Sequence, residues 1–116
     1  MRRAGADMVI DFNQMKEEIL HHFKGGEKYM MAKMVDDGTN KILLSRLIPG
    51  ATIGKHTHDT SSEIIFIIEG HGISYVDDEE SKVGPGCCQY CPKGHSHQLI
   101  NTGTKDLVFF AVVPAQ

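Results

Sequence analysis

Two histidines and a glutamate stand close together in the stretch KHTHDTSSEIIFIIEG, which runs from Lys55 to Gly70. In an extended strand, residues i and i+2 point to the same face about 6.6 Å apart, so His56 and His58 can direct both imidazoles at one point. Glu63 opens the apolar run after the short turn DTSS and is placed to add a carboxylate from the next strand. Two imidazoles and a carboxylate in this arrangement indicate a site for a metal ion.

A second set of spaced residues lies in GCCQYCPKGHSHQLIN, from Gly86 to Asn101. It contains His97, which is the candidate for a fourth ligand. The two sets have the spacings Gly50-X5-His56-X-His58-X4-Glu63-X6-Gly70 and Gly86-X5-Pro92-X-Gly94-X2-His97-X3-Asn101. At every fixed position, these spacings resemble the two signature motifs of the cupin family.

The resemblance implies an all-β protein, a small jelly-roll β-barrel of the kind also called a double-stranded β-helix. It implies one divalent transition metal inside the barrel, held by His56, His58, Glu63 and His97. Three nitrogens and one carboxylate suit iron, manganese, nickel, cobalt or zinc, and the spacing does not choose among these metals. The resemblance also implies a homodimer, because members of the family pair their barrels.

The composition indicates one globular domain and argues against several classes of partner. The chain has 116 residues, of which 41% are hydrophobic, and a formal net charge of -3. It has no cluster of lysine and arginine for nucleic acid, no run of about 20 apolar residues for a membrane, and no targeting signal. Three cysteines within five residues fit reduced thiols better than a disulfide framework, so the expected location is the cytoplasm.

The pattern along the chain predicts an N-terminal extension over residues 1–27 and a barrel domain over residues 28–116. Within the extension, apolar residues at helical spacing follow Asp11 and end at Gly25, which predicts one amphipathic α-helix over residues 12–23. In the barrel domain, short runs separated by turn residues predict strands. The expected strands are 29–35, 42–48, 63–69, 73–76, 87–91, 97–101 and 107–113.

The strand that begins at Glu63 is apolar on both faces. Ile65 and Ile67 follow Glu63 inward, while Ile64, Phe66 and Ile68 face the other way. A neighbouring sheet, the N-terminal helix or a second subunit would have to cover that second face. The second subunit is our first choice.

Other polar residues near the motifs have simpler interpretations. Cys88 and Cys91 form a CXXC, but residues three apart on a strand face opposite sides, so ordinary packing is expected rather than a redox pair or a zinc knuckle. Cys87 and Gln89 share a face with Cys91, and a thiol could line the cavity if that face points inward. His95 is expected at the rim of the barrel, and the acidic run DDEE at 77–80 is expected at a hairpin tip.

Three functions are compatible with the sequence. The first is a metal-dependent enzyme acting on a small polar metabolite, as an oxygenase, isomerase or lyase; no residue is assigned as a catalytic base. The second is a non-catalytic module that binds or senses a sugar or an organic acid at the metal. The third is a purely structural metal, and a polar cavity of about 300 Å³ or more would argue against it.

Overall fold

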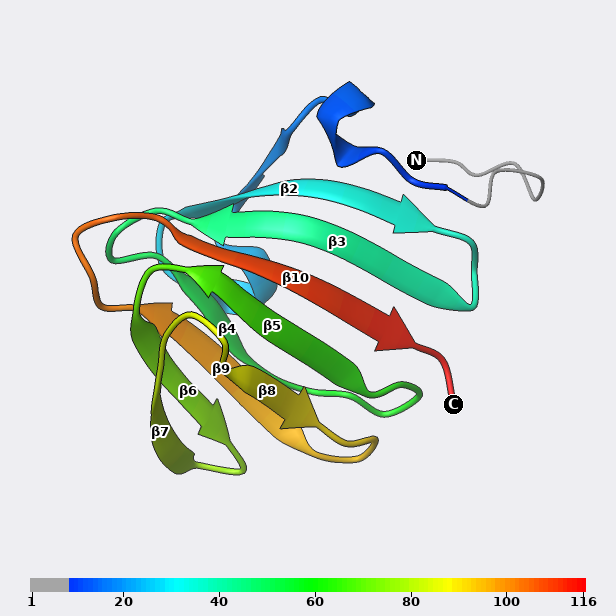
Figure 1. The fold of residues 1–116 in the computed structure, drawn as a ribbon. Coiled ribbons are helices and arrows are strands. Elements are labelled where there is room, and N and C mark those ends of the chain that lie inside the picture. Colours follow the sequence, from blue (N-terminus) through cyan, green and yellow to red (C-terminus); the bar gives the residue numbers. More distant parts are fainter. Residues whose placement is uncertain (1–8) are drawn as a thin grey trace.

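The computed structural model describes residues 9–116, which form two antiparallel sheets that face each other (Figure 1). One sheet has six strands in the order β1-β2-β3-β10-β5-β8, and the other has four in the order β4-β9-β6-β7. The elements in chain order are η1 (Phe12–Gln14), β1 (Glu18–His21), η2 (Phe23–Gly25), β2 (Tyr29–Asp36), β3 (Asn40–Leu47), β4 (Thr52–Thr57), β5 (Glu63–Glu69), β6 (Gly72–Val76), β7 (Glu79–Val83), β8 (Cys88–Cys91), β9 (Ser96–Asn101) and β10 (Leu107–Pro114).

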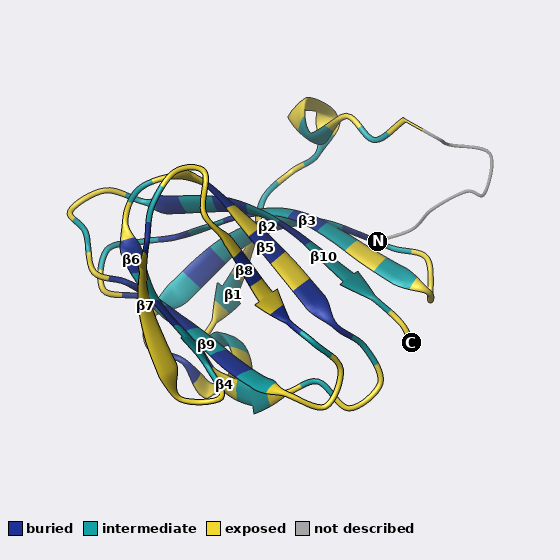
Figure 2. Cartoon of the chain, turned by 60° about the horizontal axis from the view of Figure 1, so that its bottom comes forward, coloured by how far each residue is buried: buried dark blue, intermediate teal, exposed yellow. Residues whose placement is uncertain are grey.

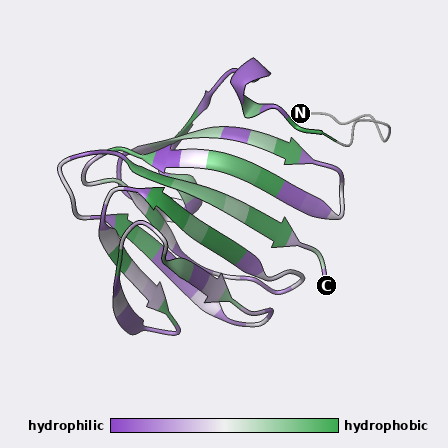
Figure 3. Cartoon of the chain, in the orientation of Figure 1, coloured by the Kyte–Doolittle hydropathy of each residue, from purple (hydrophilic) through white to green (hydrophobic). Residues whose placement is uncertain are grey.

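Alternating burial along the strands determines which side chains enter the space between the sheets. In β5 the odd-numbered positions Glu63, Ile65 and Ile67 are buried, while Ile64 and Phe66 are exposed. Figure 2 shows this alternation of burial as changes of colour along β5, whereas in Figure 3 the same strand is hydrophobic over most of its length. The expected inward and outward faces of this strand are therefore confirmed.

The hydrophobic core lies between the two sheets. Its largest apolar side chains have relative exposures of 0–1%, and they come from both sheets: Met30, Leu47, Ile65, Ile67, Leu99, Leu107 and Phe109. The all-β fold is confirmed, because every residue of this core except Ala51 lies on a strand.

The predicted α-helix over residues 12–23 is wrong. Asp11 does cap a turn, since its Oδ1 accepts a hydrogen bond from the amide of Asn13 at 2.9 Å, but that turn is the three-residue 3₁₀ helix η1. The chain then becomes β1, which pairs with β2 in the register Ile19 to Met31. A lone twelve-residue helix is marginal in water, whereas the open edge of β2 offers backbone hydrogen bonds, so strand pairing replaces the helix.

Residues 1–8 of the predicted N-terminal extension lie outside the described residues. Within residues 9–116, η1 and η2 are the helical elements, and neither is long enough or apolar enough to cross a membrane. Phe12 and Glu17 contact the outer face of the six-stranded sheet. Phe12 makes an edge-to-face contact with Phe110, and Glu17 pairs with Arg46 at 2.8 Å.

Two further strands, besides β1, are absent from the expected set. β4 begins within PGATIG, which has the composition of a turn, and β7 includes part of the acidic run DDEES. β7 pairs with β6 at the edge of the smaller sheet, and four of its five residues are exposed. Backbone hydrogen bonds to β6 therefore stabilise β7 more than burial of apolar side chains does. The tip of this hairpin is Asp77 and Asp78, both at positive φ, as a tight two-residue turn requires.

Gly70 and Gly26 show where the chain tolerates no side chain. Gly70 has φ +87° where the chain turns out of β5, and a Cβ there would lie 2.5 Å from the carbonyl oxygen of Asp106. A Cβ on Gly26 would lie 2.0 Å from the carbonyl oxygen of Thr52. This close approach holds η2 against β4, next to the site described below.

Candidate metal centre

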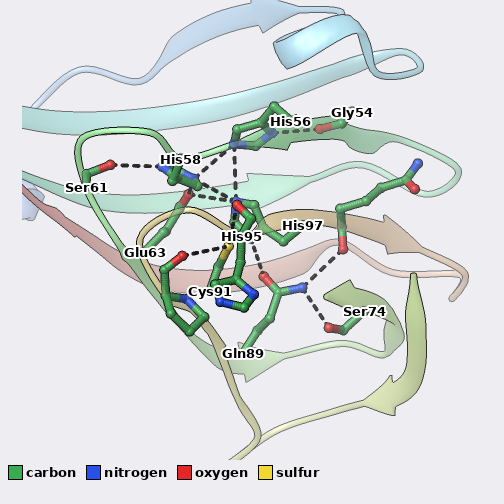
Figure 4. Close-up of polar contacts among 12 residues, drawn as sticks. Gly54, His56, His58, Ser61, Glu63, Ser74, Gln89, Cys91, His95 and His97 are labelled. Carbon is green, nitrogen blue, oxygen red and sulfur yellow. Dashed lines mark hydrogen bonds and ion pairs between the residues drawn. The ribbon is translucent and has the colours of Figure 1, made fainter. Parts of the chain in front are cut away.

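The two sheets bring His56, His58, Glu63 and His97 together inside the barrel (Figure 4). His56 lies on β4 and His97 on β9, and the two are directly paired across these strands. His58 follows β4, and Glu63 opens β5 in the opposite sheet. Side chains separated by up to 41 positions in the chain therefore meet at one point, as the spacing of the two motifs predicts.

The three imidazoles form a nearly symmetrical triangle. The Nε2 atoms of His56 and His58 are 3.1 Å apart, those of His58 and His97 are 2.9 Å apart, and those of His97 and His56 are 3.2 Å apart. Each pair of rings makes an angle of 60°. Oε1 of Glu63 lies 3.0 Å from Nε2 of His58 and 3.1 Å from Nε2 of His97.

This arrangement fits a single metal ion. Ligand atoms from all four residues lie within 4.8 Å of one another, which suits one ion with metal–nitrogen and metal–oxygen bonds of about 2.0–2.2 Å. Three Nε2 atoms this close cannot all be satisfied by hydrogen bonds to one another, because each imidazole nitrogen is either a donor or an acceptor. A cation would satisfy all three lone pairs and the carboxylate at once.

Each imidazole also has a partner for its other nitrogen. Nδ1 of His56 donates to the carbonyl oxygen of Gly54 at 2.8 Å, and Nδ1 of His58 forms a hydrogen bond with Oγ of Ser61 at 2.9 Å, in which either atom can be the donor. Nδ1 of His97 donates to Oε1 of Gln89 at 2.8 Å. Where Nδ1 donates, as in His56 and His97, Nε2 is the nitrogen left to face a metal, and an ion would displace the Nε2 protons that otherwise bond to Glu63.

Gln89 is a positioning residue that the sequence did not identify. It lies on β8 and is 4% exposed. Its Nε2 donates to Oγ of Ser74 at 2.6 Å and to the carbonyl oxygen of Gln98 at 3.1 Å. Because both acceptors face the amide nitrogen, the amide oxygen must point at His97. The sequence did contain one signal: Gln89 is a polar residue on the same strand face as Cys91. That face points inward, since both residues are buried.

Replacing Gln89 by leucine should weaken metal binding about 10- to 100-fold, because Nδ1 of His97 loses its acceptor and the ring is no longer held in the ligating tautomer. Titration with Zn²⁺ against a competing chelator measures the change. Gln98→Leu is the matched control, since Gln98 takes part in this network only through its backbone oxygen. Equal zinc affinities for Gln89→Leu and the unchanged protein would refute this role of Gln89.

The electrostatic environment keeps the cluster in its ligating form. Burial by itself raises the pKa of Glu63, but the hydrogen bonds from His58 and His97 outweigh it and hold that pKa at about 2. Burial is also the main effect on His56 and lowers its pKa, because a buried imidazolium is poorly solvated. At neutral pH Glu63 is therefore a carboxylate and His56 is a neutral imidazole.

A small cavity of about 110 Å³ opens beside His56, His58 and Glu63. Most of its wall is apolar, and two lysines complete it. The remaining lining residues are Phe23, Lys24, Met30, Met34, Lys41, Leu43, Ile53, Phe109 and Val113.

The neighbouring cysteines and His95 lie outside the cluster. Cys88 is exposed and Cys91 is buried, so the two thiols of the CXXC diverge as strand geometry predicts. Burial raises the pKa of Cys91 to about 11, so this thiol stays protonated, and it donates to the carbonyl oxygen of His95 at 3.4 Å. The His95 ring is about half exposed and pairs with Asp77, which agrees with its expected place at the rim.

Comparison with known proteins identifies a family match and several similar proteins. The profile of the cupin domain family matches residues 43–113. The oxalate-binding protein of Thermotoga maritima is 29% identical over 117 residues, which cover 96% of this chain and 97% of that protein. A glucose-6-phosphate isomerase of Thermococcus kodakarensis is 27% identical over 103 residues, covering 77% of this chain and 54% of the isomerase.

Solved structures show the same fold. The crystal structure of a predicted oxalate decarboxylase from Thermotoga maritima superposes with a TM-score of 0.88 at 24% identity, covering 94% of this chain and all of that one. The structure of a protein from Thermus thermophilus superposes with a TM-score of 0.74 at 19% identity, covering 92% of this chain and 96% of that one.

Proposed function

The chain belongs to the cupin domain family, and on that basis we propose that it holds one divalent transition metal through His56, His58, Glu63 and His97 and binds a small carboxylate at that metal. The observation that carries the proposal is the convergence of three Nε2 atoms and one carboxylate oxygen, with the second nitrogen of every ring already hydrogen-bonded. Iron, manganese, nickel, cobalt and zinc all accept this set of donors.

The size of the cavity limits the ligand. Its volume of about 110 Å³ is well below the ~300 Å³ that would have argued against a purely structural metal, so the volume does not argue against that alternative. If the metal does bind a ligand, a cavity of this size favours a two-carbon acid whose oxygens coordinate the ion over a sugar. The name of the Thermotoga oxalate-binding protein, which is similar over nearly the whole chain, supports oxalate as the first ligand to test.

The residues of the chain have separate tasks in this proposal. The ion supplies a Lewis acid that attracts and polarises a bound carboxylate. Glu63 offsets part of the charge of the ion, and the three imidazoles set the direction from which the ligand approaches. The apolar wall formed by Met30, Leu43 and Phe109 keeps water away from the ligand.

Binding without turnover is the role that the site supports best. Apart from the four residues of the cluster, Lys24 and Lys41 are the titratable groups that line the cavity among the described residues. No further aspartate, glutamate, tyrosine, cysteine or histidine lines it to move a proton. This favours the binding module over the enzyme that the sequence placed first.

Metal analysis combined with calorimetry tests the proposal. We expect about one transition-metal ion per chain after loading with Mn²⁺, Co²⁺, Ni²⁺ or Zn²⁺, and oxalate binding that disappears when the ion is removed with a chelator. A loaded protein that binds neither oxalate nor any other small acid at millimolar concentration would instead indicate a structural ion. Consumption of oxalate by the loaded protein would restore the enzyme as the leading function.

We also propose that a second copy of the chain covers the outer face of β5 and β8. Ile64, Phe66, Ile68 and Tyr90 are 39%, 44%, 40% and 56% exposed there, which is a large apolar patch for one side of a sheet (Figures 2 and 3). Light scattering should give the mass of a dimer for the unchanged protein and of a monomer for Phe66→Asp. Ile19→Asp is the matched control, because Ile19 is equally exposed but lies on β1 at the opposite edge of the sheet.

A further inference from the structure

Lys41 occupies a position that would normally hold an apolar residue. Every second residue of β3 faces inward. Leu43 and Leu47 lie on the same face of the strand as Lys41, and both are in the core, with exposures of 5% and 0%. Lys41 therefore stands on the inner face of the six-stranded sheet, at the end of the strand where the barrel opens. Its side chain lines the cavity beside His56, His58 and Glu63.

Lys24 reaches the same cavity from another part of the chain. It lies in η2, which packs against β4 of the smaller sheet, and its backbone has the left-handed φ of 55°. This conformation is uncommon for a lysine and directs the side chain back over its neighbour, where Nζ lies 5.6 Å from the centre of the Phe23 ring. Phe23 lines the cavity as well, so the ring helps to hold the ammonium group near the opening.

Neither lysine has an acidic partner within residues 9–116. Asp36 is paired with Lys41 across β2 and β3, but the two form no ion pair, and Oδ1 of Asp36 accepts from the amide of Gly38 at 2.9 Å. Other lysines of the chain do find partners, as Lys55 does with Asp78 at 2.8 Å. Two ammonium groups thus remain available at the opening of a cavity whose wall is otherwise mostly apolar.

We propose that Lys24 and Lys41 select doubly charged small carboxylates over singly charged ones, an inference that rests on the proposed function. A divalent ion balanced by Glu63 alone leaves one positive charge, and the two lysines raise the charge facing the ligand to three. A monoanion satisfies the ion but leaves the lysines unpaired. A small dianion can place one carboxylate group on the ion and direct its remaining charge towards the lysines.

Calorimetry with oxalate and oxamate tests this inference on the metal-loaded protein. Oxamate has nearly the shape of oxalate but replaces one carboxylate by a neutral amide. We expect Lys24→Met and Lys41→Met each to lower the preference for oxalate about two- to fivefold, because an exposed ion pair contributes up to about 1 kcal/mol, and the double variant to lower it more than either single variant. Lys41→Arg keeps the charge and should keep the preference.

Lys82→Met is the matched control, since it removes the same charge from exposed strand β7, outside the cavity. A preference for oxalate that is the same in Lys41→Met, Lys24→Met and Lys82→Met would overturn the selective role and leave the proposed function standing. Loaded protein that binds neither oxalate nor oxamate would overturn both. The melting temperature of each variant shows that it is folded, which is expected because both lysines are exposed.

Discussion

Replacing His97 by alanine is expected to lower the affinity for a divalent metal about 100- to 1,000-fold. Four-ligand zinc sites bind with roughly 10–16 kcal/mol, so one ligand accounts for about a quarter of that, or ~2.5–4 kcal/mol. Two further features of His97 make it difficult for another ligand to take its place. It is 2% exposed, so water cannot easily replace the imidazole, and its removal leaves Oε1 of Gln89 without the donor that it now has at 2.8 Å.

The measurement is metal content by mass spectrometry after loading and dialysis, together with a chelator competition. Circular dichroism shows whether the variant is folded, and Glu63→Gln provides a second substitution that keeps size and removes only the charge. His95→Ala is the matched control, because His95 stands two residues earlier in the same sequence GHSH but its ring is about half exposed. Unchanged metal affinity of folded His97→Ala in the chelator competition would mean that the four residues do not form a metal site.

Acidification from pH 8 to pH 5 is expected to release the metal. Binding needs three unprotonated imidazoles, and the reference pKa of histidine is about 6.5, so protons compete with the ion across this interval. Burial lowers the pKa of His56, so this ring takes up its proton later in the series. Metal content measured through the series should fall steeply, and unchanged occupancy at pH 5 would contradict a site built on histidines.

The metal-free protein should also lose stability in acid, in two ranges of pH. Burial makes the pKa of His56 lower in the folded than in the unfolded chain, so below about pH 6.5 the unfolded chain binds more protons and the free energy of unfolding falls. Glu63 acts in the same direction: its pKa is about 2 when folded and 4.5 as a reference, so the stability it adds is full above pH 4.5 and is lost as the pH falls towards 2.

The contribution of Glu63 is on the order of 3 kcal/mol, because one pKa unit corresponds to about 1.36 kcal/mol and the side chain is buried. Urea unfolding of the metal-free protein at pH 7, 4 and 3 measures the loss. In Glu63→Gln the decline below pH 4.5 should be smaller, while the decline near pH 6 should remain. If the two proteins lose stability equally below pH 4.5, the carboxylate is not held ionised by its two histidine neighbours.

Much of this protein could be predicted from local patterns. Alternation along EIIFIIE determines which side chains enter the barrel, because a strand has a period of two residues whatever surrounds it. The spacing of the two motifs likewise identified four residues that the fold brings within 4.8 Å of one another. Both patterns depend on residue type and separation, which the sequence contains in full.

The N-terminal region shows where local patterns were insufficient. The apolar spacing of residues 12–23 is genuinely helical, and Asp11 does cap a turn, yet β1 forms because β2 offers an unpaired edge. A strand in isolation has no partner to bond with, so its stability is a property of the neighbouring strand rather than of its own residues.

Gln89, Lys24 and Lys41 depend on the tertiary structure in the same way. Nothing in the local sequence distinguishes Gln89 from Gln98, or Lys41 from Lys82. They differ because Gln89 of β8 reaches His97 and because β3 begins at the opening of the cavity. The sequence alone determined the strand faces and the four convergent residues, whereas the packing of the two sheets decided which other side chains face them, because those contacts join strands that are distant along the chain.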